Sequence, residues 1–193
     1  MNYLAHIKLS GNNEEILLGN FMGDFVKGSH YNRYNNQIKK GILLHRFIDD
    51  FTDSHAKVKE DVKLLSKHIG RYAPVALDVY YDHLLTQNWK QFENQSLHVF
   101  CDEFYSTISK HKELLPDKCK FMFTYMKRDN WLKSYQDVSG VGKVLERMAK
   151  RAKYQSNLEH SIKHILDHKK QIDSGFVDFF NDITLKSKQF ING

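Results

Sequence analysis

Acidic and imidazole side chains recur one helical turn apart between residues 41 and 53. His45, Asp49 and Asp53 are spaced four residues apart, so on a helix they lie along one face. The apolar side chains of the segment fall on a different face: Leu44, Phe47, Ile48 and Phe51. A histidine nitrogen and an aspartate oxygen one turn apart can bind the same metal ion. The alternative is an ordinary polar face in contact with water.

A second acidic pair, Asp78 and Asp82, also lies one turn apart, with His83 next to it. Like charges at this spacing repel by roughly 0.2–0.5 kcal/mol on an exposed helix, and by more where water is excluded. The pair therefore requires a compensating cation. That cation is either a metal ion or an arginine such as Arg46 or Arg71, in which case the carboxylates belong to a structural ion-pair network.

Asp24 is a third acidic candidate. The pattern predicts a helix over 14–27, which places Asp24 in the last turn, where the helix dipole disfavours an anion. A carboxylate there is either exposed and screened or functional, and Lys27 is its plain structural partner. A metal site built from the three segments would use five residues: Asp24, His45, Asp49, Asp78 and Asp82.

The elements that must position these residues are all helical. Beyond 14–27, helices are expected over 36–53, 56–69, 73–88, 96–115, 117–128, 131–137 and 141–154. Residues 157–190 are expected to form one or two helices, with Gly175 as the weak point. No segment alternates like a strand between hairpin turns, and 2 Pro and 10 Gly leave little material for many turns. The expected fold class is all-α, with residues 1–193 in a single-domain helical bundle.

The composition fits such a domain. Hydrophobic residues make up 41% of the chain, with 13 Phe, 10 Tyr and 2 Trp, which excludes an intrinsically disordered protein. Cys101 and Cys119 stand in no CxxC pattern, so two buried free thiols are expected. The N-terminus lacks a signal-peptide pattern, and no apolar stretch approaches the ~18 residues of a membrane span. We therefore expect a cytoplasmic protein.

The formal net charge is +6. Such a surface favours acidic partners, namely nucleic acid, an anionic membrane or an acidic protein. Excess lysine can also serve solubility alone. No interleaved basic and aromatic pattern of a nucleic-acid reader is visible, so nucleic acid is not an expected partner.

The candidate residues stand within longer motifs. In chain order these are Met1-Asn2-Tyr3-Leu4-Ala5-His6, Gly19-Asn20, Asp24-Phe25-Val26-Lys27-Gly28, Gly41, His45-Arg46, Ile48-Asp49, Thr52-Asp53, Arg71-Tyr72-Ala73-Pro74, Leu77-Asp78-Val79 and Asp82-His83. In these motifs the chain resembles the acyl carrier protein phosphodiesterases, a family related distantly to the HD phosphohydrolases. The C-terminal half resembles the family only in being helical. Gly23 stands where the family pattern has Ala, and Ala56 where it has Pro; neither departure is expected to touch a candidate ligand.

The resemblance implies an HD-like helical fold and a reaction. That reaction is hydrolysis of the diester joining a serine of holo acyl carrier protein to 4′-phosphopantetheine. A divalent cation suits it, because the cation neutralises the anionic diester and lowers the pKa of a bound water. Mixed His and carboxylate ligation favours Mn²⁺, with Mg²⁺ and Zn²⁺ as alternatives. The order Asp82-His83, rather than His-Asp, means that the HD ligand set does not transfer directly.

Catalytic roles are then expected for Asp24, His45, Arg46 and His83, with Arg46 clamping a phosphate oxygen. His6 is expected either to contact the substrate or metal, or to be a packed core histidine.

The acidic carrier protein would be attracted by the net charge. Its expected contacts are Lys27, Lys39 and Lys40, which lie near the first two motifs in sequence. Two other classes of function remain open: an HD-like phosphohydrolase of a nucleotide or another small diester, and a non-catalytic helical binding protein whose acid pairs are ion-pair networks.

Overall fold

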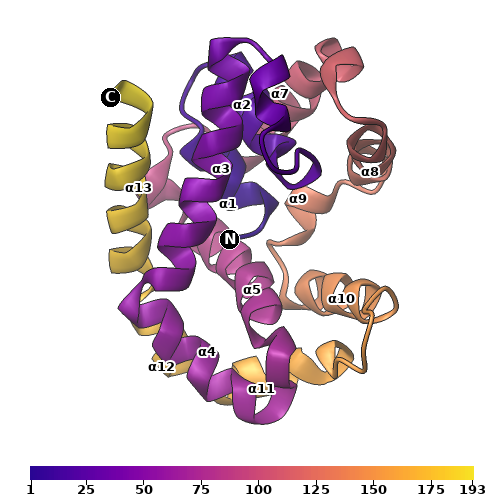
Figure 1. Cartoon of the computed structure of the whole chain (residues 1–193). Helices are drawn as coiled ribbons and strands as arrows, with labels where there is room; N and C mark the ends of the chain where they lie inside the picture. Colours follow the sequence, from indigo (N-terminus) through magenta and orange to yellow (C-terminus); the bar gives the residue numbers. More distant parts are fainter.

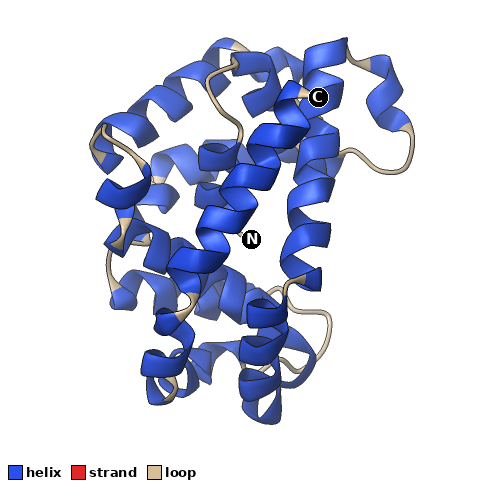
Figure 2. Cartoon of the chain, turned by 90° about the vertical axis from the view of Figure 1, so that its left-hand side faces the viewer, coloured by secondary structure: helices blue, strands red, loops and turns tan.

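The computed structural model describes residues 1–193, and helices are its only regular elements (Figures 1 and 2). The all-α fold class is thereby confirmed. The first six α-helices are α1 (Tyr3–Leu9), α2 (Glu14–Phe21), α3 (Asn36–Ser54), α4 (Ala56–Ile69), α5 (Ala73–Gln87) and α6 (Trp89–Phe92). They are followed by α7 (Leu97–Lys110), α8 (Asp117–Arg128), α9 (Trp131–Ser134), α10 (Val138–Ala149), α11 (Ser161–Asp167), α12 (Lys169–Ser174) and α13 (Phe176–Asn192). Short 3-10 helices are η1 (Gly23–Phe25), η2 (His30–Arg33), η3 (Gly70–Tyr72), η4 (Lys112–Leu114) and η5 (Leu158–His160).

The helix boundaries agree with the sequence pattern best where local signals are strong. Helices α4 and α8 begin and end at the expected residues, and Pro74 lies in the first turn of α5. The helix expected over 14–27 stops at Phe21 and gives way to η1, which contains Asp24. The C-terminal segment breaks at Gly175 as expected, and also at His168.

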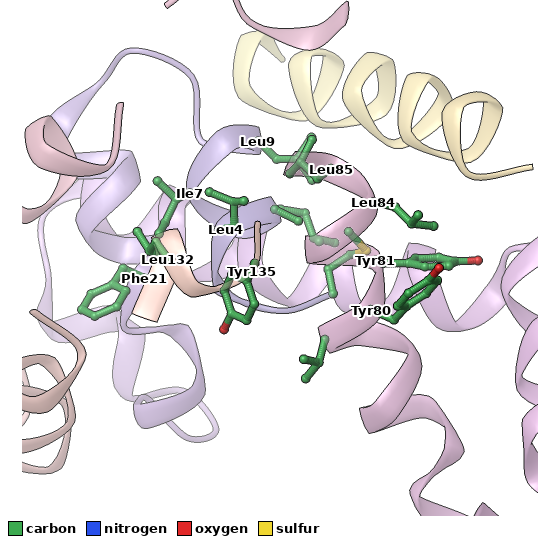
Figure 3. Packing of buried hydrophobic residues seen from close by; sticks show 14 of the residues in the cluster. Leu4, Ile7, Leu9, Phe21, Tyr80, Tyr81, Leu84, Leu85, Leu132 and Tyr135 are labelled. Atoms are coloured by element: carbon green, nitrogen blue, oxygen red, sulfur yellow. The ribbon is translucent and has the colours of Figure 1, made fainter. Parts of the chain in front are cut away.

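Helix α1 was not expected, yet it lies at the centre of the molecule, among α2, α3 and α5 (Figure 1). Figure 3 shows its side chains packed in one core with those of α5 and of the segment that follows α9. Leu4 and Ala5 are fully buried, and the core is a single cluster of 46 buried residues. Burying each large apolar side chain contributes about 1.5–3 kcal/mol. The N-terminal segment is therefore part of the core.

Helices α2 and α3 pack unusually closely, because glycine faces backbone at their crossing. A Cβ atom on Gly19 would lie 2.1 Å from the backbone oxygen of Ile38, and one on Gly41 would lie 2.2 Å from that of Ile16. No side chain fits at either position. The close approach brings Asn20 of α2 against His45 of α3.

The remaining expectations for the fold concern the thiols and the membrane. Cys101 and Cys119 are buried and form no disulfide, as expected. No helix has the length and apolar character needed to cross a membrane.

Candidate metal centre and active site

Side chains from α1, α3 and η1 meet in one cluster. His6 comes from α1, and His45 and Asp49 from α3; their ligand atoms all lie within 4.8 Å of one another. The Asp49 carboxylate places one oxygen 3.1 Å from Nε2 of His6 and the other 3.2 Å from Nε2 of His45. The two imidazole rings stack with their centroids 4.2 Å apart. Asp24, from η1, places Oδ1 3.4 Å from Nε2 of His45.

Asn20 orients both imidazoles. Its side-chain NH₂ donates to the backbone oxygen of His6 and to Oγ of Ser10, each at 2.9 Å. Its amide oxygen therefore faces Nδ1 of His6 at 2.9 Å, and this nitrogen must carry the proton. The backbone oxygen of Asn20 accepts a hydrogen bond from Nδ1 of His45, also at 2.9 Å. With both Nδ1 atoms donating, the two rings are oriented so that their Nε2 atoms face the carboxylates.

The charge states of the cluster suit a bound cation. Burial, with His45 close by, lowers the pKa of His6, so this ring is neutral at pH 7. Burial raises the pKa of Asp49, but its contacts with His6 and the α-amino group of Met1 outweigh burial, and the net shift is downward. The contact with His45 lowers the pKa of Asp24. The Nε2 atoms thus face ionised carboxylates, and either a proton on a ring or a cation bound between them balances the negative charge.

The cluster forms one wall of a cavity of about 380 Å³. Four carboxylates line this cavity: Asp24, Asp49, Asp53 and Asp78. The α-amino group of Met1 is the cation among them, 3.2 Å from Asp78 and 3.8 Å from Asp49. So much negative charge repels a phosphate ester unless further cations are bound.

A divalent metal ion fits this donor set. Nε2 of His45 is buried and has no hydrogen-bond partner, so it is available as a ligand. The lowered pKa values of His6 and Asp49 favour the neutral imidazole and the ionised carboxylate that metal binding requires. Asp24 adds a further carboxylate, with 59% of its side-chain surface exposed.

Comparison with known proteins identifies a family of similar sequences. The family described as acyl carrier protein phosphodiesterase matches residues 1–183. The chain belongs to this family. A relative in Photorhabdus laumondii named acyl carrier protein phosphodiesterase is 36% identical over 181 residues, covering 93% of this chain and 91% of the relative. Relatives of the same name in Serratia proteamaculans (33% over 189 residues, 97% of this chain and 98% of the relative) and Yersinia enterocolitica (34% over 181 residues, 93% and 94%) are similar. No solved structure matches the chain.

Of the residues expected at the site, the structure brings His6, Asp24, His45 and Asp49 together. All four belong to the motifs that resemble the phosphodiesterase family. His6 is buried, with 3% of its surface exposed, and its Nε2 faces Asp49 in the cluster.

The second acidic pair is placed differently from the expectation. Asp78 lines the 380 Å³ cavity beside the cluster, called the metal cavity below, and pairs with the α-amino group of Met1. Asp82 is fully buried beneath α1, where Oδ2 accepts the N–H of Leu4 at 2.8 Å and Oδ1 the N–H of Ala5 at 3.1 Å. Neither carboxylate pairs with an arginine, and Asp82 has no ligand atom in the cluster. Asp82 instead binds the first free N–H groups of α1 and so positions the helix that carries His6.

We expect Asp82→Asn to destabilise the protein. Only one oxygen remains to accept two buried N–H groups, and the new NH₂ meets a donor, at a cost of about 1–3 kcal/mol. For a chain of this size the melting temperature should fall by several degrees. Thermal unfolding of this variant beside Asp50→Asn, an exposed carboxylate nearby, measures the effect. Equal melting temperatures would show that Asp82 does not hold α1.

Arg46 and His83 also lie away from the cluster. Arg46 Nη2 donates to the backbone oxygens of Val26 and Gly28, both at 2.8 Å, and its guanidinium covers the ring of Tyr31. It therefore holds the loop that follows Asp24 and does not face the metal cavity. His83 is buried, and its Nδ1 contacts the backbone oxygen of Tyr135 at 2.7 Å. Both residues support the site from outside.

The three lysines expected to contact the carrier protein differ in environment. Lys27 is exposed and forms no ion pair, although Asp24 lies three residues before it. Lys39 lies over the ring of Tyr31. Lys40 is partly buried and donates to the backbone oxygen of Ile191 at 2.6 Å, so it ties α3 to the end of α13.

Gly23 does touch a candidate ligand, contrary to the expectation from sequence. A Cβ atom at this position would lie 2.3 Å from Cγ of His45. The glycine thus lets the imidazole of His45 lie directly against η1.

Asn20 is the site residue that residue types alone did not single out, although it stands in the Gly19-Asn20 motif. We expect Asn20→Ala to lower kcat/KM about 10–100-fold, the usual cost of losing an outer contact that orients metal-bound histidines. Mn²⁺ affinity should weaken in parallel, which isothermal titration can measure. Asn12→Ala, at an exposed asparagine, is the matched control. Unchanged metal affinity in Asn20→Ala would argue against the orienting role.

Proposed function

We propose that this chain is a divalent-metal-dependent phosphodiesterase that hydrolyses the bond between the serine of holo acyl carrier protein and 4′-phosphopantetheine. Membership of the family and the names of the relatives support the reaction and the substrate. The observation that carries the metal dependence is the buried, unpartnered Nε2 of His45, which faces two carboxylates.

The residues divide the work as follows. His6, His45 and Asp49 hold the ion, with Mn²⁺ favoured by the mixture of imidazole and carboxylate ligands. The bound ion supplies positive charge for the diester and makes a water molecule more acidic. Asp24 is ionised and exposed at the edge of the cavity, so it would accept a hydrogen bond from the attacking water and orient it. Asn20 keeps both rings in the tautomer that binds metal.

Mass spectrometry of holo carrier protein incubated with the chain and Mn²⁺ tests this function. We expect the carrier protein to lose the mass of 4′-phosphopantetheine, which should appear free in solution, and chelation of Mn²⁺ should stop the reaction. Intact holo carrier protein, with turnover of a nucleotide or generic diester, would favour the HD-like phosphohydrolase instead. Absence of any turnover and any metal binding would favour a non-catalytic binding protein.

We expect kcat/KM for holo carrier protein to fall steeply with ionic strength, with kcat changing much less. The carrier protein is acidic, and charge attraction acts over a Debye length, about 10 Å at 0.1 M salt and about 3 Å at 1 M. At low salt, the double variant Lys27→Glu/Lys39→Glu should have a lower kcat/KM than the parent. This loss should resemble the loss that high salt causes in the parent.

The matched control is Lys63→Glu/Lys67→Glu, which makes the same change in net charge on exposed positions of α4. A flat salt response, or equal losses in both double variants, would argue against steering by the surface around the site.

A further inference from the structure

A second, much smaller cavity adjoins the metal cavity. Its volume is about 60 Å³. Five of its lining side chains are aromatic or aliphatic, and two are arginines: Tyr3, Trp131, Tyr135, Val144, Met148, Arg147 and Arg151. Tyr3 and Met148 also line the metal cavity, so the two spaces share a wall. The residues that line this apolar cavity come from α1, from α9 and the residue that follows it, and from α10 and the turn after it.

The back wall of the apolar cavity is rigid. Tyr135 has 1% of its surface exposed and packs in the core near Leu4 and Leu132 (Figure 3). Its hydroxyl accepts a hydrogen bond from the side chain of Asn2 at 2.9 Å, and its backbone oxygen contacts His83 at 2.7 Å. Burial raises the pKa of the hydroxyl, so the wall stays uncharged. Such a wall selects a ligand by shape and apolarity.

The rim of the apolar cavity is positive. Arg147 lies in the last turn of α10 and Arg151 in the turn that follows this helix; both are exposed and form no side-chain hydrogen bond or ion pair. Met148, which lies between them in the chain, lines both cavities, so the arginines flank the side of the apolar cavity that adjoins the metal cavity, where a phosphate oxygen that does not reach the metal would need a cation. Unpaired arginines next to an apolar cavity suit a ligand with an anionic group joined to a small apolar one.

We propose that the apolar cavity binds the dimethyl-substituted carbon of the pantetheine arm, with Arg147 and Arg151 flanking the phosphate. This inference rests on the proposed function. In 4′-phosphopantetheine a single methylene separates the phosphate ester oxygen from a carbon that bears two methyl groups. A site that holds the phosphorus must therefore offer a small apolar space close by. A nucleotide carries a polar ribose at the same distance from phosphorus, so the cavity also disfavours nucleotides.

The test compares two phosphate monoesters on the Mn²⁺-loaded protein by isothermal titration. Neopentyl phosphate carries the branched carbon at the right distance, and ethyl phosphate lacks it. Burial of each additional CH₂-sized group strengthens binding about fourfold, so neopentyl phosphate should bind at least about tenfold more tightly. Val144→Phe fills the cavity and should reduce this preference to less than about twofold. Val99→Phe, the same change at a site 47% exposed on α7, should keep it.

Arg147→Gln/Arg151→Gln should lower the affinity for both esters by the same factor and leave the ratio of the two affinities unchanged. This second variant tests the rim if Val144→Phe fails to fold. Equal affinity of the parent for both esters, or a preference that survives in Val144→Phe, would overturn the inference. If the parent releases 4′-phosphopantetheine but does not prefer neopentyl phosphate, the ligand proposed for the apolar cavity is wrong and the proposed function stands. A neopentyl preference with intact holo carrier protein would instead count against the proposed function.

Discussion

Asp49→Asn is expected to lower kcat/KM for holo carrier protein by at least about a thousandfold. Asp49 is the one carboxylate that contacts both imidazoles, with its two oxygens 3.1 and 3.2 Å from their Nε2 atoms. The substitution removes the negative charge that would hold the ion of the proposed metal centre, and a bound ion contributes several kcal/mol to catalysis. Each 1.36 kcal/mol is a factor of about ten in rate. Steady-state kinetics with saturating Mn²⁺ measures the loss.

Asp50→Asn is the control for this prediction. It makes the same chemical change one residue later on α3, at an exposed position away from the cluster. We expect parental activity in this control. If Asp49→Asn keeps an activity within tenfold of the parent, Asp49 is not a ligand of the metal ion.

His6→Gln is expected to reduce turnover at least about a hundredfold, with a melting temperature close to that of the parent. Glutamine fills most of the same space and can still bond to Asn20, but it lacks the Nε2 lone pair that faces Asp49. Loss of one of two imidazole ligands should also weaken Mn²⁺ binding. Kinetics and thermal unfolding of the same preparations separate the two effects, with His30→Gln as the exposed control. A large drop in melting temperature with near-normal specific activity would make His6 a packing residue.

Half of the proposed metal centre can be predicted from sequence because its residues are close together in the chain. His45 and Asp49 are one turn apart on α3, and the helix period alone places them on one face. Asp24 is a candidate from sequence because it falls in the last turn of the helix expected over 14–27, although α2 ends at Phe21 and η1 carries the residue. The assembly of these three side chains with His6 depends on contacts between distant segments, which no local pattern contains.

Helix α1 shows why the position of His6 in the cluster could not be predicted from the sequence. It has seven residues, too few to be stable in isolation, and the side chain of Asn2 does not cap it. Its first N–H groups are bound by Asp82, a residue 77 and 78 positions away from Ala5 and Leu4. The same long-range contact gives Asp82 a structural role where its spacing from Asp78 indicated a metal ligand.

Arg46 and His83 illustrate the same limit. Both stand next to site-forming residues in sequence, and both are turned by about 100° around their helices from their neighbours. Arg46 therefore reaches the carbonyls of the 26–28 loop, and His83 reaches Tyr135. Adjacency in a motif did not imply adjacency in the cavity.

The glycines of α2 and α3 were matched as motif residues, but their purpose appears only in three dimensions. Gly19 and Gly41 permit the helix crossing that places Asn20 against both rings. A larger residue at either position would separate Asn20 from His45, and the orientation of the imidazoles would be lost with it.

Titration with Mn²⁺, followed by electron paramagnetic resonance of the free aqueous ion, tests the metal centre most directly. We expect the parent to remove one Mn²⁺ per chain from solution, and His6→Gln/His45→Gln to remove none at the same concentrations. His30→Gln/His111→Gln, which alters two histidines outside the cluster, should bind as the parent does. A parent that leaves the free Mn²⁺ signal unchanged, or a His6→Gln/His45→Gln variant that binds the ion as tightly as the parent, would contradict a metal centre at His6, His45 and Asp49.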